Sequence, residues 1–342
     1  MKKFFSIMLV LCIALCFCSC STKTDTAATK SIYEFGKEIT TASAFCEGLG
    51  FVLLDNDQTK AYCITEDGDV VFEIYVNDNS TIRGLIWEVR FINGLALFGE
   101  DFYDKNGKKT SPEDVGVKAF SAAALDGGYI LATTDDEKTG IMDTNFNWTV
   151  EPTTDIYEAL GWNVYERYPS ESIFLYEDHI ISDPGCINLV NGGVVDGYQS
   201  EYNWEYAELE EKAKIFIKGK SIVTNYDDNT FTVIDENEEQ LFEPIKINHD
   251  TYEIRTDGNI VVMSNLKLNG YPYPHANTLK LSIYDMSGTL VSELNTDYFK
   301  DNEEVIEWKL GDGAITINTC VGTPRDGIFK SYIYDTQFNR VF

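Results

Sequence analysis

The chain has 342 residues, of which 56 are acidic and 27 basic, and its formal net charge at pH 7 is −29. This excess of negative charge repels phosphate backbones, which excludes nucleic acid as a partner. Hydrophobic residues make up 44% and aromatic residues 13% of the sequence. That content supports a packed core and excludes a disordered acidic tail.

Residues 1–19 have the three zones of a secretory signal peptide. Lys2 and Lys3 come first, an apolar run interrupted only by Ser6 occupies residues 4–17, and small or sulfur-bearing residues follow at 18–21. The run is shorter than the ~20 apolar residues that a membrane-spanning helix needs. We therefore predict that residues 1–19 direct export and are then removed.

The predicted cut site resembles that of bacterial lipoproteins, in which an aliphatic residue and two small residues precede a lipidated cysteine. Ser19 precedes Cys20 as the pattern requires, whereas Phe17 and Cys18 replace the usual leucine and alanine. The resemblance implies that Cys20 carries the lipid and that two acyl chains anchor the protein on the extracytoplasmic face of the cell membrane. An ordinary cleaved signal is the alternative. Residues 20–30 contain no large apolar residue and are predicted to form a flexible tether.

Eight cysteines are present, but four of them lie in the signal or at its cut. The other four belong to the predicted domain: Cys46, Cys63, Cys186 and Cys320. They could form two disulfides in any of three pairings or remain thiols, and their spacing matches no zinc site.

We predict no cofactor. Calcium is a weak alternative at three aspartate-rich segments that are more typical of turns, at 55–57, 67–69 and 227–229.

A hairpin signal recurs along the chain, most clearly as Ile-Tyr-Asp-Met-Ser-Gly at 283–288. Asp or Thr at the first turn position can accept hydrogen bonds from backbone amides two residues on, and Gly at the fourth position can take the left-handed conformation. Each copy therefore predicts a strand, a tight turn and a strand. The copies with Phe or Glu at the fourth position are predicted to be strained or altered, with Asn147 and Asn339 taking positive φ instead. The copy at 187–192 lacks the acid.

The spacing of these turns predicts the architecture. Their fourth positions lie at residues 68, 107, 146, 192, 238, 288 and 338. Steps of about 40–50 residues built from short strands are typical of a propeller, in which each blade packs only on its neighbours. We therefore predict an all-β fold in which residues 31–342 form a single β-propeller of seven blades. Residues 31–40 are predicted to complete the last blade and so to close the ring.

A second element precedes the first two hairpins, as Phe-Cys-Glu-Gly-Leu-Gly at 45–50 and Phe-Ile-Asn-Gly-Leu-Ala at 91–96. Here the sequence resembles the WG-repeat family, whose repeats read Phe-x-x-Gly-Leu-Ala, a strand, then Gly-x-Ile-Asp-x-x-Gly-x-x-Val. The stretch at 140–152, which carries a tryptophan after its turn, is the most similar. The likeness is clear over residues 41–160 and faint beyond. It implies an interaction or binding scaffold without catalytic residues.

Two departures from the repeat are candidate binding features. Residues 200–213 place apolar side chains on one helical face and predict one short helical insertion, either a cover for blade edges or a partner-binding lid. The loop at 269–275 contains two prolines and presents Tyr271, Tyr273 and His275, which together with Trp162 could face a sugar or a peptide. Packing against the domain itself is the alternative for these aromatic residues.

The sequence contains no nucleophile elbow, P-loop or dinucleotide fingerprint, and its three histidines have no metal-ligand spacing. We therefore predict a membrane-anchored extracytoplasmic propeller that acts as an interaction or ligand-binding scaffold, with an envelope protein or a glycan as partner. A glycan-active enzyme, either a hydrolase or a lyase, is one alternative, and its carboxylates cannot be chosen from sequence. A structural role in envelope assembly is the other.

Overall fold

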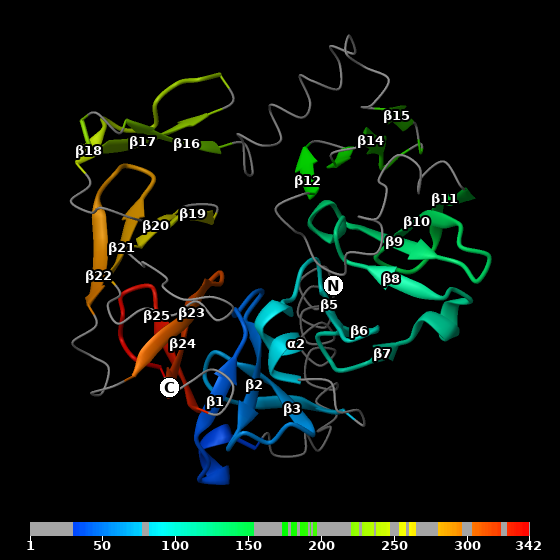
Figure 1. Ribbon diagram of the computed structural model, residues 1–342, viewed down its shortest axis with the longest axis horizontal. Helices are drawn as coiled ribbons and strands as arrows, with labels where there is room; N and C mark the ends of the chain where they lie inside the picture. The colour runs from blue at the N-terminus through cyan, green and yellow to red at the C-terminus, as the bar shows by residue number, and fades with distance from the viewer. Residues whose placement is uncertain are drawn as a thin grey trace, which may run out of the picture.

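The strands form antiparallel sheets in which chain neighbours pair, and these sheets follow one another around a common centre, which makes the fold a β-propeller (Figure 1). The computed structural model describes residues 30–76, 82–153, 173–176, 179–182, 185–190, 192, 194–196, 220–225, 228–235, 237–246, 253–257, 260–264, 280–295, 303–322 and 327–341. Within these ranges there are seven sheets of three or four strands, one for each repeat turn. We number them sheets 1 to 7 in chain order.

Sheets 1 to 3 contain eleven strands. Sheet 1 consists of β1 (Ile39–Ala42), β2 (Leu49–Leu54), β3 (Lys60–Thr65) and β4 (Val70–Tyr75). Sheet 2 consists of β5 (Leu95–Phe98), β6 (Asp101–Asp104) and β7 (Lys109–Thr110). Sheet 3 consists of β8 (Ala119–Ser121), β9 (Tyr129–Thr133), β10 (Thr139–Asp143) and β11 (Trp148–Thr153). The short helices of this part are η1 (Ile32–Phe35), α2 (Ile82–Glu88), η2 (Pro112–Val115) and η3 (Leu125–Gly127).

Sheets 4 to 7 continue the order. Sheet 4 consists of β12 (Ile173–Tyr176), β13 (His179–Ser182), β14 (Gly185–Asn188) and β15 (Val194–Asp196). Sheet 5 consists of β16 (Lys220–Asn225), β17 (Thr230–Asp235) and β18 (Ile245–Lys246). Sheet 6 consists of β19 (Glu253–Asp257), β20 (Ile260–Ser264), β21 (Lys280–Asp285) and β22 (Leu290–Asn295). Sheet 7 consists of β23 (Glu304–Leu310), β24 (Ala314–Val321) and β25 (Ile328–Asp335).

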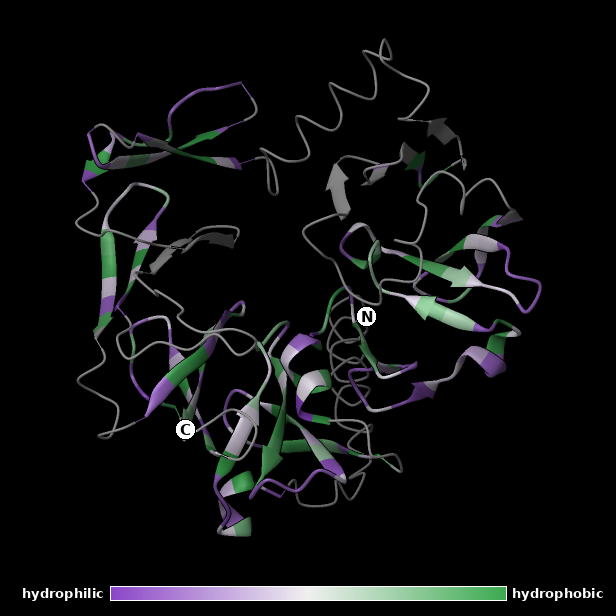
Figure 2. Ribbon diagram, in the orientation of Figure 1, coloured by the Kyte–Doolittle hydropathy of each residue, from purple (hydrophilic) through white to green (hydrophobic). Residues whose placement is uncertain are grey.

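The core lies between neighbouring sheets, as burial along the strands of sheet 1 demonstrates. All six residues of β2 are buried, because the strand is covered on both faces, whereas alternate residues of β4 are exposed. Figure 2 shows hydrophobic residues along the bodies of the strands and hydrophilic residues in many of the connecting turns. The stability of each sheet therefore depends on the neighbours that cover its faces.

The contact between sheets 1 and 2 is built from aromatic side chains, which we call the aromatic junction: Phe51, Phe72, Phe91, Phe98 and Tyr103. The rings of Phe51 and Phe91 stack with centroids 5.4 Å apart, and Phe98 lies 5.6 Å from Phe51. Phe51 is completely buried. Offset and tilted ring pairs of this kind add to the free energy gained by burying their area.

The short helices were not predicted from the sequence, and α2 is the one that packs against the aromatic junction. Its residues Ile82 and Ile86 are fully buried in the cluster that contains the aromatic junction. Their spacing of four residues puts both on one helical face, and this was the signal available in the sequence. The helical insertion predicted at residues 200–213 lies outside the described residues, and no described helix is both long and apolar enough to span a bilayer.

The strand expected to complete the last sheet belongs to the first. β1 pairs with β2, with Ala42 opposite Val52, and the described strands of sheet 7 are β23, β24 and β25. Backbone bonds also tie Lys30 and Ile32 to sheet 1, at Val70 and Gly68. The ring nevertheless closes beside this segment, because β1 lies against β24 and β25 (Figure 1). We call this contact between sheets 7 and 1 the seam.

Candidate functional site

The predicted site residues lie outside the described part of the chain. This applies to the lipidation candidate and to the proposed ligand-facing residues: Cys20, Trp162, Tyr271, Tyr273 and His275. Among the described residues, Cys46, Cys63 and Cys320 form no disulfide. Burial raises the pKa of the Cys63 thiol, which is the expected effect of placing a small apolar-like side chain in a core.

The repeat turns have the predicted chemistry. In the turn that follows β21, the Asp285 carboxylate accepts hydrogen bonds from the backbone N–H groups of Ser287 (2.9 Å) and Thr289 (3.0 Å). The same pair of bonds is made by four further aspartates: Asp104, Asp143, Asp235 and Asp335. Hydrogen bonds from backbone amides hold the pKa of Asp143 and Asp235 below the usual range of a carboxyl.

The fourth turn position has positive φ in every copy, whatever residue occupies it. Phe146, Glu238 and Phe338 have φ of 64°, 63° and 57°, close to the values of the glycines. Our expectation that Asn147 and Asn339 take positive φ instead is therefore wrong, as neither does. The Asp side chain and the strand register determine the turn conformation. A Phe or Glu at the fourth position therefore adopts the left-handed conformation despite its unfavourable energy.

Glycine at this position has a second use in some copies. A side chain added to Gly107 would place its Cβ 2.6 Å from Phe72 of the preceding sheet, so the turn packs directly on the neighbouring sheet. In the fourth copy, Asn188 substitutes for the missing acid, because its side-chain oxygen accepts from the N–H of Val190 (3.0 Å). That turn is one residue longer, since the N–H of Gly192 donates to the carbonyl of Asn188.

The aspartate-rich segments serve as turns. Asp57 accepts from the backbone N–H (2.9 Å) and hydroxyl (2.7 Å) of Thr59, and these bonds hold its pKa below the usual range. Asp69 donates its N–H to the Thr65 hydroxyl within the first repeat turn. Within the described ranges, no three His, Cys, Asp or Glu side chains gather closely enough to hold a metal ion.

The Phe-x-x-Gly-Leu elements form tight turns that lead into β2 and β5, the second strand of sheet 1 and the first strand of sheet 2. Glu47 and Asn93 have positive φ, followed in each case by a glycine with positive φ. The Glu47 carboxylate accepts from the N–H of Gly94 (3.0 Å) and pairs with Lys105 (2.9 Å). Asn93 in turn donates to the carbonyl of Leu125 in sheet 3 (2.7 Å). The element is therefore a polar link between blades.

The seam is held by side chains that bond to the backbone of β1 and the turn after it. Asn318 of β24 donates to the carbonyl of Ala42 (3.1 Å) and accepts from its N–H (3.3 Å). The Thr316 hydroxyl donates to the carbonyl of Ser43 (2.8 Å). The Asn318 side chain thus makes the two hydrogen bonds to the Ala42 backbone that a neighbouring strand would make. Asn318 is 1% exposed.

The chain also comes very close to itself at the turn between β23 and β24. A Cβ on Gly311 would lie 1.7 Å from the carbonyl oxygen of Phe45, so only glycine fits there. Asp312 donates its N–H to that carbonyl (2.9 Å), and its carboxylate accepts from the N–H of Glu47 (2.7 Å).

Arg83 of α2 joins three parts of the ring. Its guanidinium donates to the Thr41 hydroxyl (3.3 Å) and to the Asn56 side chain (3.0 Å), both in sheet 1. On its other side it lies 3.6 Å from the centre of the Phe329 ring, in sheet 7. Burial lowers the pKa of Arg83, but the group stays charged at any physiological pH. The side chain therefore acts as a fixed cation beside the seam.

A pocket of about 260 Å³ opens at the seam between residues 32–39 and residues 330–340, and we call it the seam pocket. Its walls come from the N-terminal segment and from β25 with the residues after it. It is lined by Ile32, Tyr33, Lys37, Glu38, Ile39, Lys330, Ser331, Tyr332 and Arg340. Three of these side chains are cationic and one is acidic, in a protein whose net charge is −29.

One wall of the seam pocket is held by a buried carboxylate. Glu303, whose side chain is 1% exposed, accepts a hydrogen bond from the Tyr332 hydroxyl (2.6 Å) and one from the Thr319 hydroxyl (3.3 Å). Lys330 lies 3.8 Å from the other carboxylate oxygen. Burial, followed by the bond to Glu303, raises the pKa of Tyr332, so this phenol stays protonated and keeps donating.

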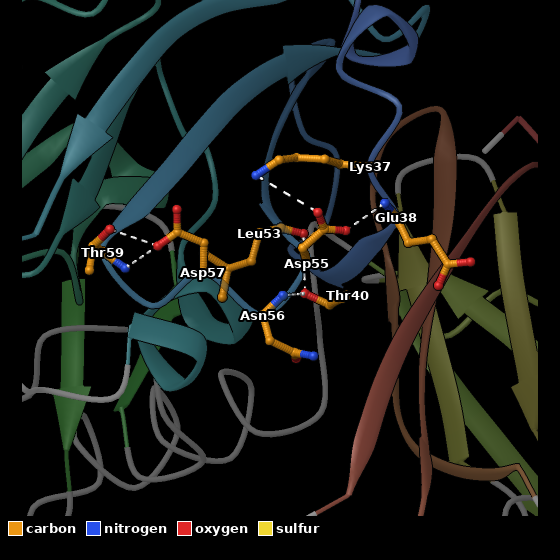
Figure 3. A network of polar contacts seen from close by, with 8 residues as sticks. All are labelled: Lys37, Glu38, Thr40, Leu53, Asp55, Asn56, Asp57 and Thr59. Atoms are coloured by element: carbon orange, nitrogen blue, oxygen red, sulfur yellow. Dashed lines mark hydrogen bonds and ion pairs between the residues drawn. The ribbon is translucent and has the colours of Figure 1, made fainter.

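The opposite wall is fixed by the turn between β2 and β3 (Figure 3). The Asp55 carboxylate accepts from the N–H of Glu38 (3.0 Å) and lies 3.8 Å from the Lys37 ammonium. The Thr40 hydroxyl donates to Leu53 and accepts from the N–H of Asn56. These contacts fix the backbone at residues 37–40, while the side chains of Lys37 and Glu38 point in opposite directions.

The rim residues of the seam pocket are accessible. The ring of Tyr33 is 60% exposed, although its hydroxyl donates to the carbonyl of Val341 across the seam (2.9 Å). Arg340 lies over the ring of Tyr332 at 4.8 Å. The pocket therefore offers an oriented aromatic face beside cationic groups. Our sequence prediction of the ring-closing segment included Tyr33, but the partners of that segment on β25 were missed.

In comparisons with solved structures, this chain is similar to several propellers. Hsv2p from Kluyveromyces lactis is 9% identical, with 87% of this chain and 98% of that chain covered and a TM-score of 0.34. A virginiamycin B lyase from Staphylococcus aureus, solved with quinupristin, is 12% identical with coverages of 88% and 97% and a TM-score of 0.34. The β-propeller domain of Cps50 (Swd1) from Myceliophteria thermophila is 12% identical with the same coverages and a TM-score of 0.37.

No protein-family model and no curated protein matches the chain. Membership of the WG-repeat family therefore stays a prediction. The similarity to solved structures concerns the fold alone, because the identities are low. The chain is a β-propeller by the arrangement of its own sheets.

Proposed function

We propose that this protein is a lipoprotein of the extracytoplasmic membrane face, related to WG-repeat proteins, whose β-propeller acts as an interaction or ligand-binding scaffold. The seam pocket is the observation that carries the binding role. It is a concave site with an exposed aromatic ring and cationic side chains, and rigid strands position its walls. The signal at residues 1–19, Cys20 and the tether at 20–30 support the location.

The enzyme alternative requires carboxylates or a histidine that converge on a substrate-sized space. In the described part of the seam, the Glu303 carboxylate accepts hydrogen bonds from Tyr332 and Thr319 and so has a structural role.

The assembly alternative requires a broad apolar patch. The exposed large hydrophobic residues of the described chain are instead distributed over sheets 1, 4, 5, 6 and 7. A binding scaffold therefore fits these observations best.

The location is tested by metabolic labelling with a radioactive fatty acid in a bacterial host. The wild-type chain should carry label and sediment with membranes, and Cys20→Ala should lose both properties. Cys18→Ala is the matched control and should keep them, because Ser19 and Cys20 remain intact. Label that persists in Cys20→Ala but disappears in Cys18→Ala would contradict the assignment of the lipid to Cys20.

The binding role is tested with the full-length protein in detergent on an array of envelope glycans, followed by analysis of any bound glycan for cleavage. A scaffold should retain its ligand unchanged over hours. Cleavage of the retained glycan would favour the enzyme alternative and overturn the proposal. Protease digestion of intact cells expressing the protein should remove the propeller if it faces outward.

A further inference from the structure

The seam pocket has a charge opposite to that of the protein that contains it. Three cationic side chains, Lys37, Lys330 and Arg340, line one small space together with the single acid Glu38. Exposed charges more than about 8 Å away are screened at physiological salt, so the distant acids of the protein do little to the local potential. The local charges therefore decide which ligands enter, and they favour an anion.

The ion pairs that Lys37 and Lys330 make with neighbouring acids are long. Lys37 is 3.8 Å from Asp55, and both side chains are well exposed, so the pair is loose and can be rearranged by a ligand. Lys330 is also 3.8 Å from its partner Glu303, a distance beyond a hydrogen bond. The Arg340 guanidinium lies over the ring of Tyr332, and this contact orients it. A guanidinium is planar and can bind a carboxylate or phosphate through two parallel hydrogen bonds.

Size and shape restrict the ligand further. Pockets for drug-sized ligands enclose ~300–1,000 Å³, and the seam pocket encloses about 260 Å³, which suits a single ring with a substituent. Tyr33 presents a ring that is 60% exposed and is fixed by its bond to Val341. A ring held in this way is a platform for the flat face of a sugar.

We propose that the seam pocket binds one acidic saccharide unit, with its carboxylate or phosphate on Arg340 and Lys330 and its ring face on Tyr33. This inference rests on the proposed ligand-binding role and narrows it to anionic sugars. Because one wall comes from residues 32–39 and the other from residues 330–340, a bound ligand also connects the first and last sheets of the propeller. Binding therefore stabilises the closed ring.

The test uses the full-length protein in detergent and calorimetric titration with D-glucuronate, D-glucose 6-phosphate and D-glucose, which share a ring and differ in charge. Both acidic sugars should bind at least about tenfold more tightly than glucose, because a charge-assisted hydrogen bond contributes about that factor. Their affinity should fall with added salt. The relative affinities of glucuronate and the phosphate identify which acidic group the site prefers.

Variants connect the binding to the pocket. Arg340→Gln should weaken glucuronate binding about tenfold and leave glucose binding unchanged. Lys37→Gln, on the exposed rim, is the second variant if Arg340→Gln unfolds, and a several-fold loss is expected. Lys118→Gln removes the same charge from an exposed pair with Glu137 in another part of the ring and should change nothing. At one glucuronate concentration, the melting temperature of the wild type should rise more than that of Arg340→Gln.

Three outcomes would overturn the inference. Glucose binding as tightly as glucuronate would sink the anionic preference while leaving a ligand-binding scaffold. Tighter binding of a tetraglutamate peptide than of glucuronate would replace the sugar by an acidic peptide. Absence of binding by all the probes, in a protein that still retains a glycan on the array, would place the binding site elsewhere on the propeller.

Discussion

The aromatic junction and the seam are both contacts between neighbouring sheets with buried apolar side chains, but the seam adds side-chain hydrogen bonds to the backbone of the opposite sheet. At the aromatic junction, Phe51 stacks on Phe91 and packs against Phe98, and these contacts are apolar. At the seam, Asn318 and Thr316 bond to the backbone of residues 42 and 43. Apolar burial is nondirectional, whereas these hydrogen bonds specify one register.

The difference follows from what each contact must do. Sheets 1 and 2 are adjacent in the chain, so the residues in contact have a short sequence separation. Close packing is therefore sufficient to bring these two sheets together in the correct arrangement. Sheets 7 and 1 are separated by almost the whole chain, and no shared strand pairs them. Directional bonds at the seam therefore select the correct partner, and the seam pocket opens between the same two sheets.

The largest effect is expected from Phe51→Ala at the aromatic junction. Loss of a completely buried ring with three aromatic neighbours should lower the free energy of unfolding by about 3–5 kcal/mol. Urea denaturation measures this value. Phe35→Ala is the matched control at the seam, where the ring is only partly buried against Tyr62, and it should cost less than half as much. Equal losses would mean that the two contacts do not differ in apolar content.

The next effect is expected from Asn318→Ala at the seam. This change leaves the buried N–H and carbonyl of Ala42 without partners and should lower the free energy of unfolding by about 2–3 kcal/mol. Asn106→Ala is the control, because the Asn106 side chain is exposed, and it should stay within about 0.5 kcal/mol of the wild type. Hydrogen exchange should quicken at residues 39–43 in Asn318→Ala and stay slow at the aromatic junction. Uniform quickening would indicate that the seam is no separate unit.

A smaller effect, of opposite sign, is expected from Glu238→Gly in the repeat turn of sheet 5. The exposed Glu238 has φ of 63°, so glycine should stabilise the protein by about 0.5–1 kcal/mol. Phe146→Gly provides the contrast. That residue has the same backbone strain, but its ring packs against Phe102 and Phe120, and its loss should be destabilising. Thermal unfolding of both variants measures the signs, and a stabilised Phe146→Gly would contradict this interpretation.

The smallest effect is expected from the pH dependence of a single repeat turn. The folded-state pKa of Asp143 lies below its unfolded value, because backbone N–H groups donate to the carboxylate. Its contribution to stability is therefore present above about pH 4 and is lost as the pH falls through the lower folded value. Solvent screening keeps the effect under about 1 kcal/mol.

Asp143→Asn measures this contribution, since the amide oxygen can still accept the turn bonds but does not titrate. The variant should melt below the wild type at pH 6, and the difference should shrink as the pH is lowered to 3. Asp335→Asn, in the sheet that forms the seam, should behave in the same way, because its turn is built alike. A difference that grows on acidification would contradict the direction of the pKa shift.

Local features of the fold could be predicted from the sequence because their causes are local. The bonds of Asp285 to the amides two and four residues on depend only on neighbouring residues, and the turn spacing follows from the length of one blade. The positive φ of Phe146 could not be predicted in this way. The packing of the Phe146 ring against Phe102 and Phe120 offsets the unfavourable energy of this conformation. These two residues are distant in sequence and become neighbours only in the folded chain.

For the candidate site too, the location of one segment could be predicted from the sequence, but its partners could not. The sequence predicted that residues 31–40 lie where the ring closes, and the segment does lie there, but its β1 strand pairs within sheet 1. The partners of this segment were missed. Lys330 and Tyr332 share a face of β25 because side chains alternate along a strand, yet nothing in that alternation indicates what the face meets.

The sequence alone was sufficient for the all-β propeller, the strand-turn-strand unit and the side-chain chemistry of each repeat turn, because these features depend on residues within one repeat. It was also sufficient to predict an export signal and Cys20 as its lipid acceptor. The tertiary structure alone decided how the ring closes and where its charges gather. Asn318 and Tyr33 are separated by hundreds of residues from the groups they contact, Ala42 and Val341, and only the packing of sheet 7 against sheet 1 brings them together.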